Sequence, residues 1–98
     1  MSDEKCDRRA LRVRITGRVQ GIGYRAWTQG NARALGLSGW VRNLRDGAVE
    51  ALFSGAEVHV FEMLARCRRG PPGAFVEDVT IIENGVPSPS GFRILPTA

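Results

Sequence analysis

The chain has 98 residues, of which 43% are hydrophobic and 24% are charged, and this size and composition fit one globular domain. Its formal net charge of +4 favours an anionic partner: nucleic acid, an anionic membrane surface or a phosphorylated small molecule. No apolar run has transmembrane length, and the polar first ten residues lack a signal-peptide pattern. We therefore expect a cytoplasmic protein with no membrane partner.

The first nine residues carry three acidic and three basic side chains, so the excess positive charge lies in the rest of the chain. We expect residues 1–9 to form a flexible tail and residues 10–98 to form a single domain. Cys6 and Cys67 are too few for a disulfide framework, and no Cys-x-x-Cys pair or histidine cluster has metal-site spacing. We expect two free thiols, with neither a metal nor a cofactor.

The first half of the chain predicts a strand, a loop and a helix. Leu11, Val13 and Ile15 alternate with polar residues, which is the period of a strand with one buried face. After a glycine-bearing segment, apolar residues recur at helical spacing from Tyr24 to Leu35, and the next residue is a glycine placed to end that helix.

The second half predicts a hairpin, a helix and further strands. Residues 37–44 and 48–54 read as two strands joined by a turn that contains an Asp-Gly pair. A second amphipathic helix follows from residue 58 and stops at Gly70, which precedes two prolines. Residues 75–83 predict the next strand, and residues 92–94 a short edge strand.

This order of elements is that of an α+β fold, the ferredoxin-like split βαβ sandwich (βαββαβ), with two helices on one face of an antiparallel sheet. Many unrelated functions share this plan, so the function must be argued from the site.

The loop between the first strand and the first helix has the features of an anion site. Free main-chain N–H groups and the helix dipole favour negative charge there, and Gly21 and Gly23 let the main chain curl around an oxyanion. Arg25 follows in the first helical turn, where a guanidinium can hold two phosphate oxygens. An ordinary turn with a solvated arginine would have the same local sequence.

Two nucleotide-binding motifs are weighed against this interpretation. Gly21-x-Gly23-x-x-Ala26 formally matches the dinucleotide fingerprint, but that fold needs successive βαβ units and a longer chain. The phosphate-loop motif of nucleoside triphosphatases is also unmatched, because no Gly-Lys-Ser or Gly-Lys-Thr follows.

Asn43 ends the first strand of the hairpin. Because the first and third strands pair in the split βαβ plan, the second strand lies near enough for this amide to face the loop. A carboxamide can donate to and accept from a water molecule without changing charge. A turn asparagine that satisfies the local backbone is the alternative.

At these two segments the sequence resembles the acylphosphatase family, small ferredoxin-like enzymes that hydrolyse carboxyl–phosphate anhydrides. The second segment matches the family pattern Gly-aromatic-Val-x-Asn-x-x-x-Gly-x-Val from Gly39 to Val49. The resemblance implies that Arg25 binds phosphate and that Asn43 orients the attacking water. It also implies a phosphate loop, which comprises Val19, Gln20, Gly21, Ile22, Gly23, Tyr24 and Arg25.

The sequence also indicates which substrates suit such a site. No Ser-His pair, Cys-His pair or paired carboxylates accompany the motifs. A carboxylate with a pKa of about 4 can leave unprotonated at neutral pH, so acyl phosphates need no protein acid. We expect a monomer that binds a small-molecule acyl phosphate or inorganic phosphate.

Two other classes stay open. One is a non-catalytic anion-binding module, or a carbamoyl-phosphate-handling domain detached from a larger enzyme. The other is an RNA-binding sheet, but that mode uses exposed aromatic residues on the central strands, where the sequence places only Phe53. We therefore expect no nucleic-acid partner.

Overall fold

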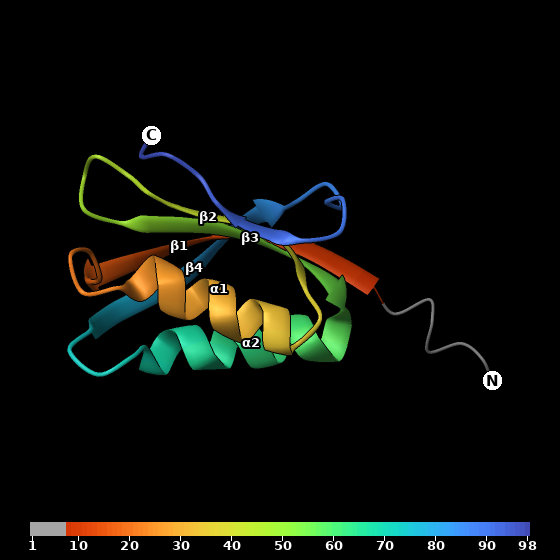
Figure 1. Cartoon of the computed structure of the whole chain (residues 1–98), viewed down its shortest axis with the longest axis horizontal. Coiled ribbons are helices and arrows are strands. Elements are labelled where there is room, and N and C mark those ends of the chain that lie inside the picture. Colours follow the sequence, from red (N-terminus) through yellow and green to blue (C-terminus); the bar gives the residue numbers. More distant parts are fainter. Residues whose placement is uncertain (1–7) are drawn as a thin grey trace.

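The computed structural model describes residues 8–98, so Cys6 and residues 1–7 of the predicted tail lie outside the described residues. The elements follow in the order β1 (Arg8–Arg18), α1 (Tyr24–Ala34), β2 (Ser38–Asn43), β3 (Val49–Ala56), α2 (Glu57–Arg69), β4 (Phe75–Asn84) and β5 (Phe92–Ile94). The predicted βαββαβ order is confirmed, with both helices on one side of the sheet (Figure 1). β1 begins at Arg8, two residues before the expected start of the domain.

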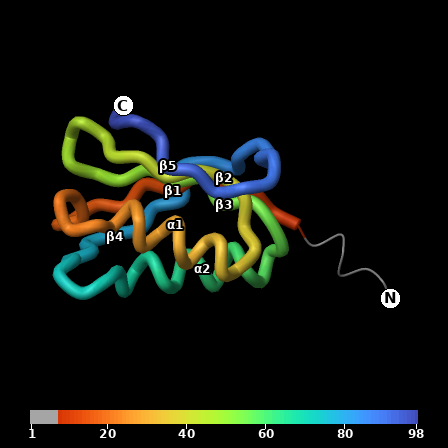
Figure 2. Tube along the Cα trace, in the orientation of Figure 1, coloured from red at the N-terminus to blue at the C-terminus, as the bar shows by residue number. Residues whose placement is uncertain are grey.

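The sheet has the strand order β4-β1-β3-β2-β5. The pairs β1–β3, β1–β4 and β2–β3 are antiparallel, as predicted, whereas β5 pairs parallel with β2. The reason is the path of residues 85–91, which cross from one edge of the sheet to the other at the end where β1 and β2 begin. β5 therefore starts at the same end as β2 and runs beside it (Figure 2).

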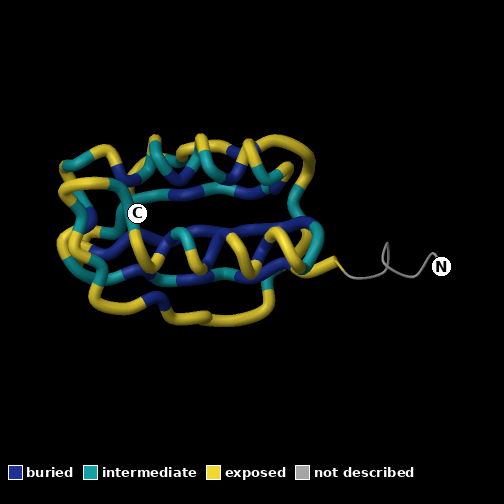
Figure 3. Tube along the Cα trace, turned by 90° about the horizontal axis from the view of Figure 1, so that it is seen from below, coloured by how far each residue is buried: buried dark blue, intermediate teal, exposed yellow. Residues whose placement is uncertain are grey.

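The alternation of β1 places its apolar side chains under the helices. Leu11, Val13 and Ile15 are at most 2% exposed and lie opposite residues of β3 that are also buried. Both helices alternate between buried and exposed residues along their turns (Figure 3). Their buried residues are Tyr24, Thr28 and Ala32 on α1 and Val60, Met63, Leu64 and Cys67 on α2. One core thus joins the sheet to both helices.

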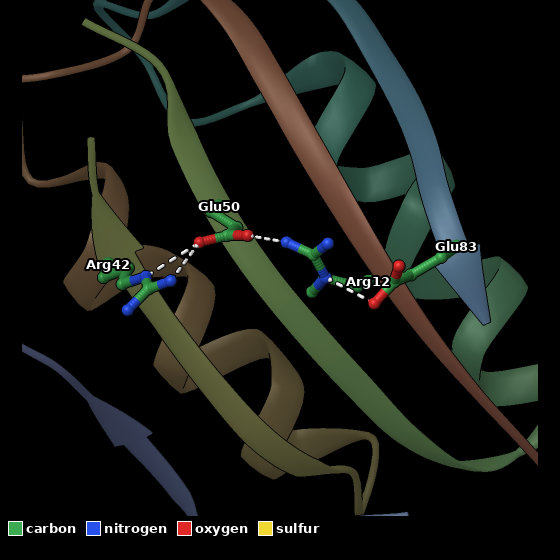
Figure 4. A network of polar contacts seen from close by, with 4 residues as sticks. All are labelled: Arg12, Arg42, Glu50 and Glu83. Atoms are coloured by element: carbon green, nitrogen blue, oxygen red, sulfur yellow. Dashed lines mark hydrogen bonds and ion pairs between the residues drawn. The ribbon is translucent and has the colours of Figure 1, made fainter. Parts of the chain in front are cut away.

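The opposite face of the sheet carries a chain of charged side chains across four strands (Figure 4). Glu50 of β3 lies between two residues whose side chains face the helices, so its own side chain points to the opposite face of the sheet, where it is 5% exposed. Its carboxylate accepts from Arg42 of β2 at 2.7 Å and from Arg12 of β1. Arg12 in turn donates to Glu83 of β4 at 3.1 Å. These ion pairs therefore connect β2, β3, β1 and β4.

The two helices of residues 8–98 have 11 and 13 residues. Within this described range, no helix has the length and apolarity needed to cross a membrane.

Candidate active site

The loop between β1 and α1 curls at two glycines. Gly21 has φ 80° and Gly23 has φ 82°, in the left-handed region that favours glycine. Gly23 is also the N-cap of α1, and Tyr24 is the first helical residue. The loop therefore enters the helix through a tight turn, and the N-terminus of α1 opens directly onto it.

The main-chain donors of this turn are free of protein partners. Within residues 8–98, the N–H groups of residues 21–26 donate to no acceptor, and the first bonded N–H of α1 is that of Trp27, 3.0 Å from the Gly23 carbonyl oxygen. Such donors at the positive end of a helix dipole attract an anion.

The loop forms one wall of a pocket of about 220 Å³. The other walls come from the end of β2 and from β5. The lining residues are Val19, Gln20, Gly21, Gly23, Tyr24, Arg25, Ala26, Asn43 and Ile94. The structure thus brings Arg25 and Asn43 together in one pocket, although 17 residues separate them in the sequence.

The remaining residues of the predicted phosphate loop take different positions. Ile22 does not line the pocket and packs against the core instead. Val19 and Tyr24 are each 1% exposed, so their side chains belong to the core. The Tyr24 hydroxyl donates to the Cys67 carbonyl oxygen at 2.8 Å, and burial raises the pKa of this phenol. Loop residues of this kind can offer an anion their main chain only.

Two lining residues were not predicted. Ala26 lies in the first turn of α1, next to Arg25, and a pattern of charged and glycine residues does not single it out. Ile94 reaches the pocket because β5 pairs with β2, which places Ile94 opposite Val41. No local sequence pattern predicts this long-range parallel pairing.

The Arg25 side chain is half-buried and takes part in no ion pair within residues 8–98. Five other arginines pair with carboxylates in that range: Arg9, Arg12, Arg14, Arg42 and Arg66. The positive charge of Arg25 is therefore available to an anion in the pocket.

Asn43 has a buried oxygen without a partner. Its Oδ1 is the one buried side-chain polar atom of residues 8–98 that takes part in no hydrogen bond. Its main chain is fixed by pairing with Val49, and its carbonyl oxygen accepts from the Ala98 N–H at 3.0 Å. An acceptor without a partner suits a ligand that can donate, such as water.

The side chain of Gln20 contacts the β2–β3 hairpin. Its Nε2 donates to the carbonyl oxygens of Leu44 and Ala48, each at 2.8 Å. These residues close the turn of the hairpin, because the Leu44 N–H donates to the Ala48 carbonyl oxygen at 2.8 Å. The loop of residues 19–25 is therefore held to the hairpin that carries Asn43, at the same end of the molecule (Figure 2).

The acidic, histidine and cysteine side chains of residues 8–98 lie away from the pocket. His59 is exposed on α2, and no Asp, Glu, His or Cys lines the pocket. Within residues 8–98, no three such side chains gather in a way that could hold a metal ion.

These features define a class: a small ferredoxin-like protein with free main-chain N–H groups in a βα loop, and with an arginine that makes no ion pair and an asparagine that line the same pocket. A family model described as acylphosphatase matches residues 11–94, which include both motifs. The chain belongs to the acylphosphatase family. The enzyme class expected from the two motifs, a hydrolase of acyl phosphates, is thereby confirmed.

Individual relatives agree with this membership. The chain is 51% identical over 89 residues to an acylphosphatase of Rhodospirillum rubrum, which covers 91% of this chain and 98% of the relative. It is 62% identical over 73 residues to an acylphosphatase of Bradyrhizobium diazoefficiens, 74% of each chain. The solved structure of an acylphosphatase from Coxiella burnetii matches with a TM-score of 0.86 and 31% identity, over 97% of this chain and 100% of that one.

Proposed function

We propose that this protein hydrolyses the carboxyl–phosphate bond of acyl phosphates, with the phosphate held by the loop of residues 19–25 and Arg25, and the water oriented by Asn43. The observation that carries these residue roles is the pocket itself. Arg25, Asn43 and most residues of the loop line it, the N–H groups at the start of α1 have no protein acceptor, and Asn43 Oδ1 is buried without a hydrogen-bond partner.

Phosphate binding would use the loop and Arg25 together. A planar guanidinium can donate to two phosphate oxygens, and the N–H groups at the start of α1 can donate to the others. As charge redistributes over the phosphoryl oxygens in the transition state, these fixed donors stabilise it without reorganising.

Asn43 would hold the nucleophile. A water molecule that donates to Oδ1 satisfies an oxygen whose burial without a hydrogen bond costs about 1–3 kcal/mol. The same contact restrains the water in line with the bond to the leaving carboxylate, because β2 and its neighbours fix the main chain of Asn43.

The reaction then needs no protein base. The water oxygen attacks phosphorus, the bond from phosphorus to the acyl oxygen breaks, and the carboxylate leaves with the electron pair. The proton of the water passes to a phosphate oxygen of the substrate, since no described titratable carboxylate, imidazole or thiol lines the pocket. A pH–rate profile that reveals an essential enzyme base near neutrality would contradict this step.

Arg25→Ala tests the phosphate role. We expect turnover of benzoyl phosphate to fall about a thousandfold, which corresponds to about 4 kcal/mol of transition-state stabilisation. Arg25→Lys should restore little, because an ammonium cannot donate in the same planar geometry. The exposed Arg18 at the end of β1 provides the control, and Arg18→Ala should leave turnover nearly unchanged. Near-normal turnover in Arg25→Ala would rule out its catalytic role.

Asn43→Ala tests the water role. We expect a lower kcat with a nearly unchanged inhibition constant for inorganic phosphate, because Asn43 acts on the nucleophile rather than on the bound anion. An equal loss of both would reassign Asn43 to phosphate binding. Phosphate binding without any turnover by the native protein would instead support a non-catalytic anion-binding module.

We also propose that the enzyme acts as a cytoplasmic monomer without a nucleic-acid partner. In support, Phe53, the aromatic residue of the central strands, is fully buried in the core. It cannot stack on a base unless the core opens. Size-exclusion chromatography tests the monomeric state. A salt-dependent gel shift with RNA would contradict the absence of a nucleic-acid partner.

A further inference from the structure

We infer that Gln20 is a positioning residue that sets the distance between the phosphate loop and Asn43, and that it does not bind phosphate with its side chain. This inference rests on the proposed roles of the loop and Asn43. It differs from the expectation that every residue of the loop binds the anion.

The first argument is the donor capacity of the Gln20 amide. A carboxamide nitrogen has two hydrogens, and Gln20 Nε2 contacts two carbonyl oxygens, those of Leu44 and Ala48, both at 2.8 Å. Both donors are therefore committed to the hairpin. The remaining side-chain atom, Oε1, is an acceptor and would repel a phosphate oxygen.

The second argument is that the hairpin closes without Gln20. The Leu44 carbonyl oxygen also accepts from the Gly47 N–H at 3.1 Å, and the Ala48 carbonyl oxygen also accepts from the Leu44 N–H at 2.8 Å. Asp46 Oδ1 accepts from the Ala48 N–H at 3.0 Å and further fixes the turn. The two bonds of Gln20 are thus additional, and their effect is to fasten the loop to the turn.

The third argument is the place where Gln20 is attached. Leu44 directly follows Asn43, and Gln20 directly precedes Gly21, where the curl of the loop begins. One side chain therefore links the strand end that carries the water-orienting amide to the start of the anion-binding turn. Because in-line attack depends on the separation of water and phosphorus, this link should affect kcat more than phosphate affinity.

The test compares Gln20→Met with Gln29→Met. Methionine keeps the length of the side chain but cannot donate. Gln29 of α1 makes the same type of bond outside the pocket, from its Nε2 to the Phe92 carbonyl oxygen at 3.0 Å. With benzoyl phosphate, we expect kcat to fall about 10- to 100-fold in Gln20→Met and to stay unchanged in Gln29→Met. The inhibition constant for inorganic phosphate should change less than about threefold in both variants.

Two outcomes would overturn the inference. One is a phosphate inhibition constant raised tenfold or more in Gln20→Met with kcat nearly intact, because this would make Gln20 a phosphate ligand. The other is unchanged kcat in a Gln20→Met protein that circular dichroism shows to be fully folded.

A double-mutant cycle tests whether Gln20 acts through Asn43. In an Asn43→Ala background, Gln20→Met should reduce kcat by less than about a further threefold. If instead the kcat losses of the two single variants multiply in the double variant, the two residues act independently and the coupling is contradicted. Should Asn43→Ala itself turn over normally, the proposed water role fails. In that case the NMR resonances of the Asn43 side-chain amide test the coupling without turnover. They should shift in Gln20→Met and not in Gln29→Met, and unchanged resonances in Gln20→Met would refute the coupling between Gln20 and Asn43.

Discussion

Glu50 is a buried carboxylate on the sheet face opposite the helices, and its replacement by glutamine should destabilise the protein without altering catalysis. Its side chain is 5% exposed and accepts from two guanidinium groups, those of Arg12 and Arg42. Removing one member of a buried pair costs about 3–5 kcal/mol when the other is left buried and uncompensated.

The loss of stability in Glu50→Gln should be smaller than that range. The two arginines that remain are 29% and 32% exposed, so water can solvate part of their charge. The loss is then close to that of hydrogen bonds to a charged group, about 2 kcal/mol. For a domain of this size such a loss lowers the urea midpoint by about 1–2 M and Tm by about 10 °C.

Urea denaturation followed by circular dichroism measures this effect, with Glu83→Gln as the matched control. Glu83 belongs to the same network, but it is 58% exposed and contacts only Arg12 in that network, so its replacement should cost less than about 1 kcal/mol. Equal losses in the two variants, or a Glu50→Gln protein as stable as the native one, would refute the reasoning from burial. In buffer without urea, kcat should be unchanged in both variants, because neither residue lines the pocket.

The remaining predictions concern alkaline pH and two glycines, one at the start of α1 and one within it. Burial raises the pKa of the Cys67 thiol to about 12 from its ordinary 9.0, and burial also raises the pKa of the Tyr24 phenol, so the unfolded chain loses these protons first as pH rises. The free energy of unfolding should therefore fall above about pH 9, by at most about 1.4 kcal/mol per pH unit for each group; Cys67→Ala should delay the decline, and equal stability at pH 8 and 11 would contradict it. Gly23→Ala should lose about 1–2 kcal/mol, because its φ of 82° disfavours a side chain. Gly30 is an exposed residue in the middle of α1, and Gly30→Ala should raise the free energy of unfolding by about 0.5–1 kcal/mol. The Tm should therefore fall in Gly23→Ala and rise in Gly30→Ala, and a shift in the same direction in both variants would contradict this prediction.

Much of the fold could be predicted from the sequence because its signals are local. Alternation over Leu11 to Ile15 predicts β1, and the glycine at position 36 predicts the end of α1, which the structure places at Ala34 with Leu35 as C-cap. The parallel pairing of β5 could not be predicted, because it depends on how residues 85–91 cross the end of the sheet. No local pattern encodes that path.

The site divides in the same way. Glycines at positions of positive φ and an arginine in a first helical turn are readable as a phosphate loop, and the split βαβ plan brings Asn43 toward it. The two bonds of Gln20 could not be predicted, because a glutamine in a loop has the same local sequence whether it binds a ligand or a distant carbonyl group. Roles that depend on side-chain contacts across the sheet require the coordinates.

The hydroxyl of Tyr24 has a consequence for motion during turnover. It joins the first residue of α1 to the last turn of α2, through a carbonyl oxygen that the helix itself leaves unbonded. A tilt of α1 would break this bond inside the core. If the pocket opens and closes around the substrate, we expect the movement to involve the Arg25 side chain and the glycine turn, on the fast timescale of local fluctuations. The two helices should keep their positions.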